Sequence, residues 1–146
     1  MPTYKAPLED MRFVLDAFGA EALWASMDAT QEVTRDLADA ILEEAGKVAE
    51  GLLQPLNRSG DEEECHWNNG VVTTPKGFKE AYKTYASSGW NALTGNPEFG
   101  GQGMPKMLSV LFEEMMHGAN SSFTLYSALS SGACLAIDAH ASEELK

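Results

Sequence analysis

The sequence predicts an all-α fold, a bundle of about five or six helices that forms one domain over residues 1–146. Apolar residues recur at the three- and four-residue spacing of a helix face along most of the chain. Alternating apolar and polar runs, which indicate half-buried strands, are almost absent. The chain also has the ordinary length of a single domain, 146 residues, which is enough to bury a core.

The net charge of the chain argues against some classes of binding partner. Ten basic and 22 acidic side chains give a net charge of −12, which repels nucleic acid and anionic membrane surfaces. Residues 119–137 carry no charge, but their serines, threonine and asparagine make them too polar for a membrane span. The first residues lack the basic region and apolar core of a signal peptide, so we expect a cytoplasmic protein.

The first two predicted helices carry apolar stripes. One spans residues 8–18 and ends near Gly19, with a stripe of Leu8, Met11, Leu15 and Phe18. The next begins near Asp28, where Gln31 completes a capping box, and ends before Pro55. Its stripe consists of Val33, Leu37, Ile41, Val48 and Leu52.

Residues 57–72 are predicted to form a polar connector, with Trp67 as an anchor and an extended piece at residues 71–72. Cys65 and His66 are adjacent, but no second pair of ligands accompanies them, so we predict no metal site. Cys65 and Cys134 are too few for a disulfide framework, and Cys134 is expected to be a buried thiol.

A third helix is expected to start at Thr74-Pro75 and to end at Gly89, with a stripe of Phe78, Ala81, Tyr82 and Tyr85. Residues 89–105, called the glycine loop below, follow it. The loop lacks the glycine spacing of a dinucleotide or Walker motif, so we interpret it as a connector between helices.

Two further helices complete the predicted bundle. The first follows Pro105 and stops at Gly118, with a stripe of Leu108, Leu111, Phe112 and Met115. The second runs from about Ser121 to Ile137, and we assign its Tyr126 and Leu129 to the core. The final residues, 142–146, have the pattern of a capped first turn.

Several of these segments together resemble the N-terminal helical domain of the acyl-CoA dehydrogenases. The family has a Pro-Glu-x-x-Gly-Gly-x-Gly loop followed by a helix with a Glu-Glu pair, and the segments of this chain that resemble them are Gly89-Trp90, residues 97–105 and Glu113-Glu114. Residues 69–82 and 4–15 are similar to the branch that includes the 3-methylmercaptopropionyl-CoA dehydrogenases. The resemblance covers nearly the whole chain.

The resemblance implies a flavoenzyme that uses FAD to oxidise an acyl-CoA thioester to the 2,3-enoyl-CoA. It implies that the catalytic base and the flavin contacts come mostly from a middle β domain and a C-terminal α domain outside residues 1–146. We therefore predict no catalytic, cofactor-binding or metal-binding residue in this chain, and we expect the fragment alone to be inactive. For the longer enzyme it implies an electron acceptor such as an electron-transfer flavoprotein and a homo-oligomer.

The small residues of the last helix are the candidates for substrate contact. In the family this helix helps to line the acyl-tail end of the cavity, which makes Ser127 and Ser131 candidate substrate-binding residues. Tight packing between helices explains the same small residues equally well. Glu113 and Glu114 are predicted to do structural work, and Glu114 with His117 supplies one of the two motifs that a di-iron site needs.

A protein of another class remains as an alternative, a free-standing helical module that binds a partner protein without catalysis. In either case we expect an exposed apolar patch, where the other domains or the partner would dock.

Overall fold

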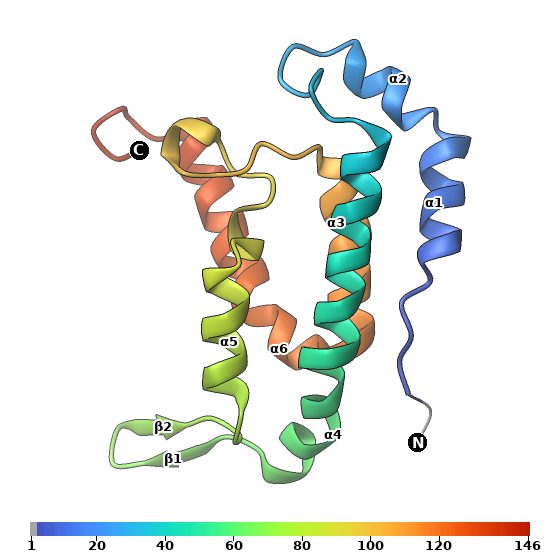
Figure 1. Cartoon of the computed structure of the whole chain (residues 1–146). Helices are drawn as coiled ribbons and strands as arrows, with labels where there is room; N and C mark the ends of the chain where they lie inside the picture. Colours follow the sequence, from blue (N-terminus) through green and yellow to red (C-terminus); the bar gives the residue numbers. More distant parts are fainter. Residues whose placement is uncertain (1–2) are drawn as a thin grey trace.

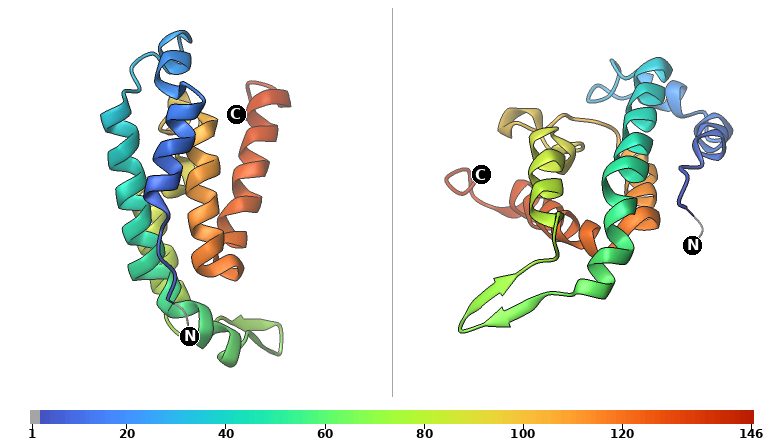
Figure 2. Two further views of the ribbon diagram at one scale, coloured as in Figure 1. Left: turned by 90° about the vertical axis from the view of Figure 1, so that its right-hand side faces the viewer. Right: turned by 60° about the horizontal axis from the view of Figure 1, so that its bottom comes forward.

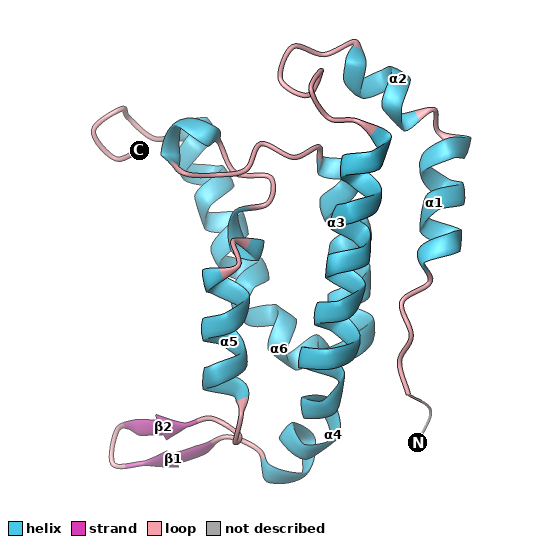
Figure 3. Cartoon of the chain, viewed as in Figure 1, coloured by secondary structure: helices cyan, strands magenta, loops and turns pink. Residues whose placement is uncertain are grey.

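The computed structural model describes residues 3–146 and confirms the all-α class (Figures 1 and 3). Within these residues the sheet content is one small antiparallel hairpin. The first elements are α1 (Leu8–Ala17), α2 (Ala20–Ala25), α3 (Arg35–Lys47), the π-helical segment η1 (Val48–Leu53) and α4 (Gln54–Glu63). They are followed by β1 (His66–Asn68), β2 (Val71–Thr73), α5 (Phe78–Ser87), the 3₁₀ turns η2 (Trp90–Ala92) and η3 (Pro97–Phe99), and α6 (Lys106–His140).

α6 consists of two helical halves that run in opposite directions (Figure 2). The chain reverses at Asn120, whose φ of −160° and ψ of 89° are not helical. The side chain of Asn120 holds the reversal, because its Oδ1 accepts the backbone N–H of Phe123 at 3.1 Å. Its Nδ2 donates to the carbonyl of Leu53 at 3.2 Å, which ties the reversal to η1.

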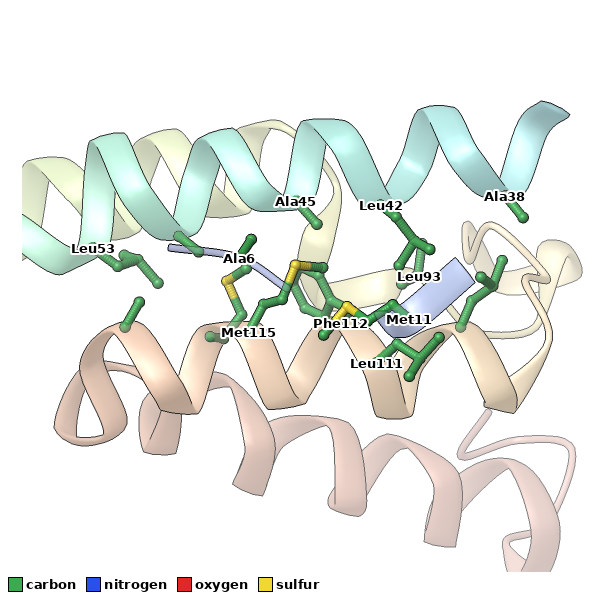
Figure 4. Close-up of a cluster of buried hydrophobic side chains, with 14 of the residues drawn as sticks. Ala6, Met11, Ala38, Leu42, Ala45, Leu53, Leu93, Leu111, Phe112 and Met115 are labelled. Atoms are coloured by element: carbon green, nitrogen blue, oxygen red, sulfur yellow. The ribbon is translucent and has the colours of Figure 1, made fainter. Parts of the chain in front are cut away.

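The core lies between α3–η1 and the first half of α6. Figure 4 shows Leu42 and Ala45 of α3 and Leu111, Phe112 and Met115 of α6 pointing toward one another. The predicted stripe of this half of α6 is confirmed, since Leu108, Leu111, Phe112 and Met115 are all buried. Met11 and Leu15 close the core from α1.

Ion pairs join α1 to α3 across the edge of this core. Arg12 contacts Asp39 at 3.3 Å and Glu43 at 2.6 Å, and Arg35 contacts Asp39 at 3.1 Å and also Asp16. Glu50 of η1 accepts the backbone N–H of Ala6 at 2.9 Å. The polar face of α3 thus also fastens the N-terminal segment.

The predicted start of the second helix is wrong. The segment after Met27 forms turns, and α3 begins at Arg35, where the hydroxyl of Thr34 caps the N–H of Leu37 at 3.2 Å. The prediction also missed α2, whose six residues are too short to show a periodic stripe.

The predicted end of that helix before Pro55 is also wrong. The helical rod continues through η1 into α4, and Pro55 is accommodated in the first turn of α4, where a missing N–H costs little. The buried face is shifted by one residue from the predicted stripe: Leu37 is exposed, whereas the core contains Ala38, Leu42, Ala45, Ala49 and Leu53. Three of the five buried residues on this face are alanines. A search for periodic large apolar residues therefore misses the face.

The predicted polar connector is partly helix and partly hairpin. α4 occupies residues up to Glu63, and β1 pairs with β2 across a turn at Asn69-Gly70. The extended piece at residues 71–72 is confirmed. Trp67 is not an anchor, because 72% of it is exposed on the hairpin, which projects from the bundle (Figure 1).

Three further helix boundaries differ from prediction by a few residues. α5 begins at Phe78 after Gly77 rather than at Thr74-Pro75, and Gly89 follows its end as expected. Gly118 does not stop the helix, because the break falls at Asn120, where the side chain supplies the cap. Phe18 lies outside α1 and is exposed.

The second half of α6 is far more exposed than predicted. Leu129 is 76% exposed and Tyr126 is 43% exposed, so their assignment to the core is wrong. Cys134 is also exposed rather than buried. The half does pack on α5 near its start, where Phe123 contacts Phe78 and Tyr85 at ring-centroid distances of 5.8 and 5.7 Å.

Candidate functional site

The glycine loop folds back on itself because two of its glycines cross. A Cβ on Gly101 would lie 2.0 Å from the carbonyl carbon of Gly95, so only a residue without a side chain fits there. Backbone bonds hold the crossing: Gly103 N–H donates to Gly95 O at 3.0 Å and Met104 N–H to Leu93 O at 2.9 Å. The loop is a connector with a fixed shape, and no phosphate-binding motif accompanies it.

Both ends of the crossing are fastened to α6. Trp90 stacks on Phe112 with ring centroids 4.9 Å apart and the planes tilted by 10°. Asn96 caps η3 by accepting the N–H of Glu98 at 3.0 Å, and its Nδ2 donates to Asp138 of α6 at 3.3 Å. The loop and the end of α6 therefore enclose a space of defined shape.

That space is a cavity of about 360 Å³, called the loop cavity below. Its apolar boundary consists of Phe99, Leu135, Ile137 and Leu145. Its polar boundary includes Asn91, Asn96, Ser131 and Asp138. An apolar lining with a few polar groups is the usual character of a small-molecule site.

The structure places the two candidate serines one helical turn apart on one face of α6. Ser131 borders the loop cavity, and its hydroxyl donates to the carbonyl of Asn91 at 3.5 Å. Ser127 is buried beneath Tyr85, with 3.4 Å between the two hydroxyl oxygens, and it donates to Thr124 O at 3.1 Å. Ser131 faces the cavity, whereas Ser127 lies deeper between α6 and α5.

Tyr85 provides the polar end of this contact between α5 and α6. Burial raises the pKa of Tyr85 to about 12, and the hydrogen bond with Ser127 only partly opposes that rise. The phenol therefore stays protonated at physiological pH and can donate or accept a hydrogen bond without acting as a base.

A second cavity of about 510 Å³ lies between α4, the base of the hairpin and α6. Arg58, Asp61 and Glu64 border it, together with Cys65 and Tyr126. Burial and the neighbouring Cys65 raise the pKa of Tyr126. Arg58 pairs with Glu62 at 2.7 Å, and Asp61 and Glu64 place two carboxylates on the same lining.

The other candidate groups do not converge on a site. Glu113 lies 3.8 Å from Lys106 along α6, and Glu114 is exposed. His117 forms a hydrogen bond with Ser121 at 3.0 Å rather than meeting further carboxylates. Among residues 3–146, no cluster of three or more His, Cys, Asp or Glu side chains could hold a metal ion.

The two cavities do not fit FAD. A flavin dinucleotide carries an anionic pyrophosphate, which needs convergent N–H donors or cations. Asp138 borders the loop cavity, Asp61 and Glu64 border the second one, and Lys146 is paired with Glu143 at 3.1 Å. We therefore assign no flavin contact to these residues.

The sequence analysis did not identify Asn91, which borders the loop cavity. It lies next to Trp90 in a stretch that shows no helical periodicity, and its position becomes evident only when the glycine crossing is built. The sequence feature that could have indicated its position is the pair Gly95 and Gly101. Where these glycines cross, the residues beside them are brought against α6.

Comparisons with known proteins agree with this architecture. The sequence profile of the acyl-CoA dehydrogenase N-terminal domain matches residues 28–146. The chain is 34% identical over 147 residues to a 3-methylmercaptopropionyl-CoA dehydrogenase of Ruegeria pomeroyi, a match that covers 99% of this chain and 24% of that protein. It is 35% identical over 114 residues to a butyryl-CoA dehydrogenase of Syntrophomonas wolfei subsp. wolfei, covering 76% of this chain and 18% of that protein.

The chain thus spans about a quarter or less of the length of the curated relatives it matches. Within the described part of the chain, no helix combines the length and the apolar character needed to cross a membrane. The glycine crossing and the helices on either side of it lie entirely within the matched residues. The chain belongs to the acyl-CoA dehydrogenase family, and its residues 28–146 correspond to the N-terminal domain of that family.

Proposed function

We propose that residues 1–146 are the N-terminal α domain of a longer FAD-dependent acyl-CoA dehydrogenase, in which they form one wall of the acyl cavity. The observation that carries the proposal is the match of residues 28–146 to that domain of the family. The complete enzyme oxidises an acyl-CoA thioester to the 2,3-enoyl-CoA. Other domains supply the catalytic base and the flavin site, and an electron-transfer flavoprotein accepts the electrons from a homo-oligomeric enzyme.

Within this wall, we assign substrate contact to Ser131 and Ser127. The acyl tail enters the loop cavity, which Ser131 borders, and the buried Ser127 lies one helical turn away from Ser131. The cavity volume of about 360 Å³ is large enough for part of an acyl chain and falls within the usual range of ligand pockets. The exposed Leu129 and Leu135 on the same half of α6 supply apolar surface that the remaining domains or the acyl chain cover.

The test uses the longer protein that carries this chain. We expect it to be yellow, to retain FAD, and to reduce a dye acceptor in the presence of acyl-CoA, whereas residues 1–146 alone stay colourless. A longer protein without flavin or acyl-CoA oxidation would refute the proposed activity.

Side-chain variants test the wall separately. Ser131→Leu fills part of the cavity, so it should raise KM for long acyl-CoA substrates about tenfold, the equivalent of a modest overpacking penalty. It should affect short substrates less. Ser59→Leu, on the exposed surface of α4, is the matched control and should leave KM unchanged. An equal effect of Ser131→Leu on every chain length would contradict the assigned wall.

A further inference from the structure

Residues 3–7, called the strap below, precede α1 as an extended segment that lies against α3 and the first half of α6 (Figure 2). The side chains of the strap alternate in burial. Tyr4 is half-buried and Ala6 is buried, whereas Thr3 and Lys5 are exposed. This alternation is typical of an extended peptide that is bound along one side. The strap therefore packs on the helices as a bound peptide does.

Two glycines, one on each helix, make room for the inward side chains of the strap. A Cβ on Gly46 of α3 would lie 3.3 Å from the Cβ of Ala6, and a Cβ on Gly118 of α6 would lie 2.7 Å from the ring of Tyr4. Neither glycine has a positive φ, so the helical backbone does not require glycine at these positions. Glycine destabilises a helix interior relative to alanine. The close approach of the strap is thus a physical reason for both glycines.

The strap is held by few polar contacts. In the described part of the chain, one hydrogen bond joins residues 3–6 to α3, η1 and α6, from the backbone N–H of Ala6 to Oε1 of Glu50 at 2.9 Å. Burial, and after it the carboxylates of Glu114 and Glu50, raise the pKa of Tyr4, so the neutral phenol lies near both α6 and η1. A terminal segment with so few contacts can open while the core stays folded.

The strap contacts the two elements that meet where α6 reverses. Gly118 lies two residues before Asn120, and Glu50 belongs to η1. The same η1 contains Leu53, whose carbonyl accepts Nδ2 of Asn120 at 3.2 Å. The strap therefore joins η1 to α6 a second time, close to the hydrogen bond that ties the reversal to η1.

We propose that the strap is a removable brace, a peptide segment of this chain that binds across η1 and α6 and keeps the reversal at Asn120 closed. When the strap is released, the hydrogen bond between Asn120 and Leu53 opens more often, and the second half of α6 gains freedom to move relative to the core. The N-terminus thereby controls the mobility of the exposed half of α6. The brace is a property of residues 3–146 and does not depend on the proposed function.

Amide hydrogen exchange of the isotopically labelled chain, measured by NMR, tests the brace. Tyr4→Ala should speed exchange of residues 121–127 by about five- to tenfold, because the ring contact with α6 is lost. Phe13→Ala is the matched control and should leave this exchange unchanged, since that ring is 71% exposed on α1. Glu50→Ala should act like Tyr4→Ala, whereas Glu50→Gln should not, because an amide oxygen still accepts the N–H of Ala6.

A second experiment tests whether the brace is removable. A chain that lacks residues 1–7 keeps the ion pairs of Arg12 and Arg35 that fasten α1 to α3, and it should exchange residues 121–127 as fast as Tyr4→Ala or faster. A synthetic peptide of residues 1–9, added at millimolar concentration, should restore slow exchange there. The same peptide with Tyr4→Ala should not restore it.

Unchanged exchange of residues 121–127 in the full-length Tyr4→Ala chain overturns the proposal. An equal acceleration in every helix, α5 included, also overturns it, because the strap would then add only to the overall stability. A truncated chain that folds but does not respond to the wild-type peptide overturns the removable character of the brace. The Tyr4→Ala comparison decides the proposal even if the truncated chain does not fold.

Discussion

The two halves of α6 adjoin in sequence, yet they have opposite roles in the domain. Before Asn120 the helix presents Leu111, Phe112 and Met115 to α3, and these side chains belong to the core (Figure 4). After Asn120, Phe123 is buried against α5, but Leu125, Leu129, Leu135 and Ile137 are exposed. One half stabilises this domain, and the other presents a surface.

The difference shows that apolar content does not by itself mark a core helix. Residues 121–137 carry no charge, which favoured a buried helix, but Leu125, Leu129, Leu135 and Ile137 are each about half or more exposed. An uncharged, exposed apolar face on a folded domain is typical of a surface that another domain or a ligand covers. Stability and function are thus separated along a single element, and substitutions in the two halves should have different consequences.

The sharpest test of this separation uses the same substitution in both halves. Leu108→Ala should lower the free energy of unfolding by about 2–5 kcal/mol, because Leu108 is fully buried and truncation leaves a cavity. Leu129→Ala should change it by less than about 0.5 kcal/mol, since that side chain is already in solvent. Urea titrations followed by circular dichroism measure both. Comparable losses would mean that the second half is part of the core.

A substitution of Asn120 tests the reversal between the two halves of α6. Asn120→Ala removes the cap on Phe123 and leaves the carbonyl of Leu53 without its donor, so we expect a loss of about 2–3 kcal/mol. Asn68→Ala, on the exposed hairpin, is the control and should be nearly neutral. Amide hydrogen exchange should show faster opening of residues 121–127 in Asn120→Ala. Unchanged exchange there would show that the reversal does not depend on this side chain.

The sequence was sufficient for the fold class, the core stripe of the first half of α6 and the family. It was insufficient wherever small residues or single side chains decide the structure. Ala38, Ala45 and Ala49 shifted the buried face of α3–η1, and Asn120 rather than Gly118 set the reversal. Ser131 borders the loop cavity and its contact with substrate stays a prediction, whereas the position of Asn91 depends on a close crossing of Gly95 and Gly101 that no local pattern encodes.

Tyr85 contacts both halves of α6 and makes the free energy of unfolding depend on pH. Its ring packs against Phe112 of the first half and Phe123 of the second, at centroid distances of 6.1 and 5.7 Å. Burial raises the pKa of Tyr85 to about 12 in the folded chain, from 10.0 in the unfolded chain. The protonated phenol therefore contributes its full share of the folding free energy below pH 10, and this share is lost as the pH rises toward 12. The unfolded chain then releases a proton that the folded chain retains.

This titration should destabilise the wild-type chain by about 1 kcal/mol by pH 11. Tyr85→Phe removes the titrating hydroxyl, so the free energy of unfolding of the variant should fall less between pH 9 and pH 11 than that of the wild type. At pH 7 the variant should lose only about 0.5 kcal/mol, because the hydrogen bond to Ser127 is long, at 3.4 Å, and Ser127 keeps its bond to Thr124. Parallel stability curves for the two proteins in alkali would show that Tyr85 is not the group that titrates.

The substitution with the smallest expected effect, Gly132→Ala, tests whether the exposed second half of α6 has a function. Gly132 lies in the second half of α6 with open space where a Cβ would be, so Gly132→Ala should raise the free energy of unfolding by about 0.5–1 kcal/mol. Gly118→Ala should gain less, because the new methyl group would lie 2.7 Å from the ring of Tyr4 and that ring must move. If residues 121–137 are covered by another domain or by substrate, Gly132→Ala should stabilise the chain yet lower the acyl-CoA dehydrogenase activity that we propose for a longer protein. A gain in stability with unchanged activity would mean that the space above Gly132 is only solvent.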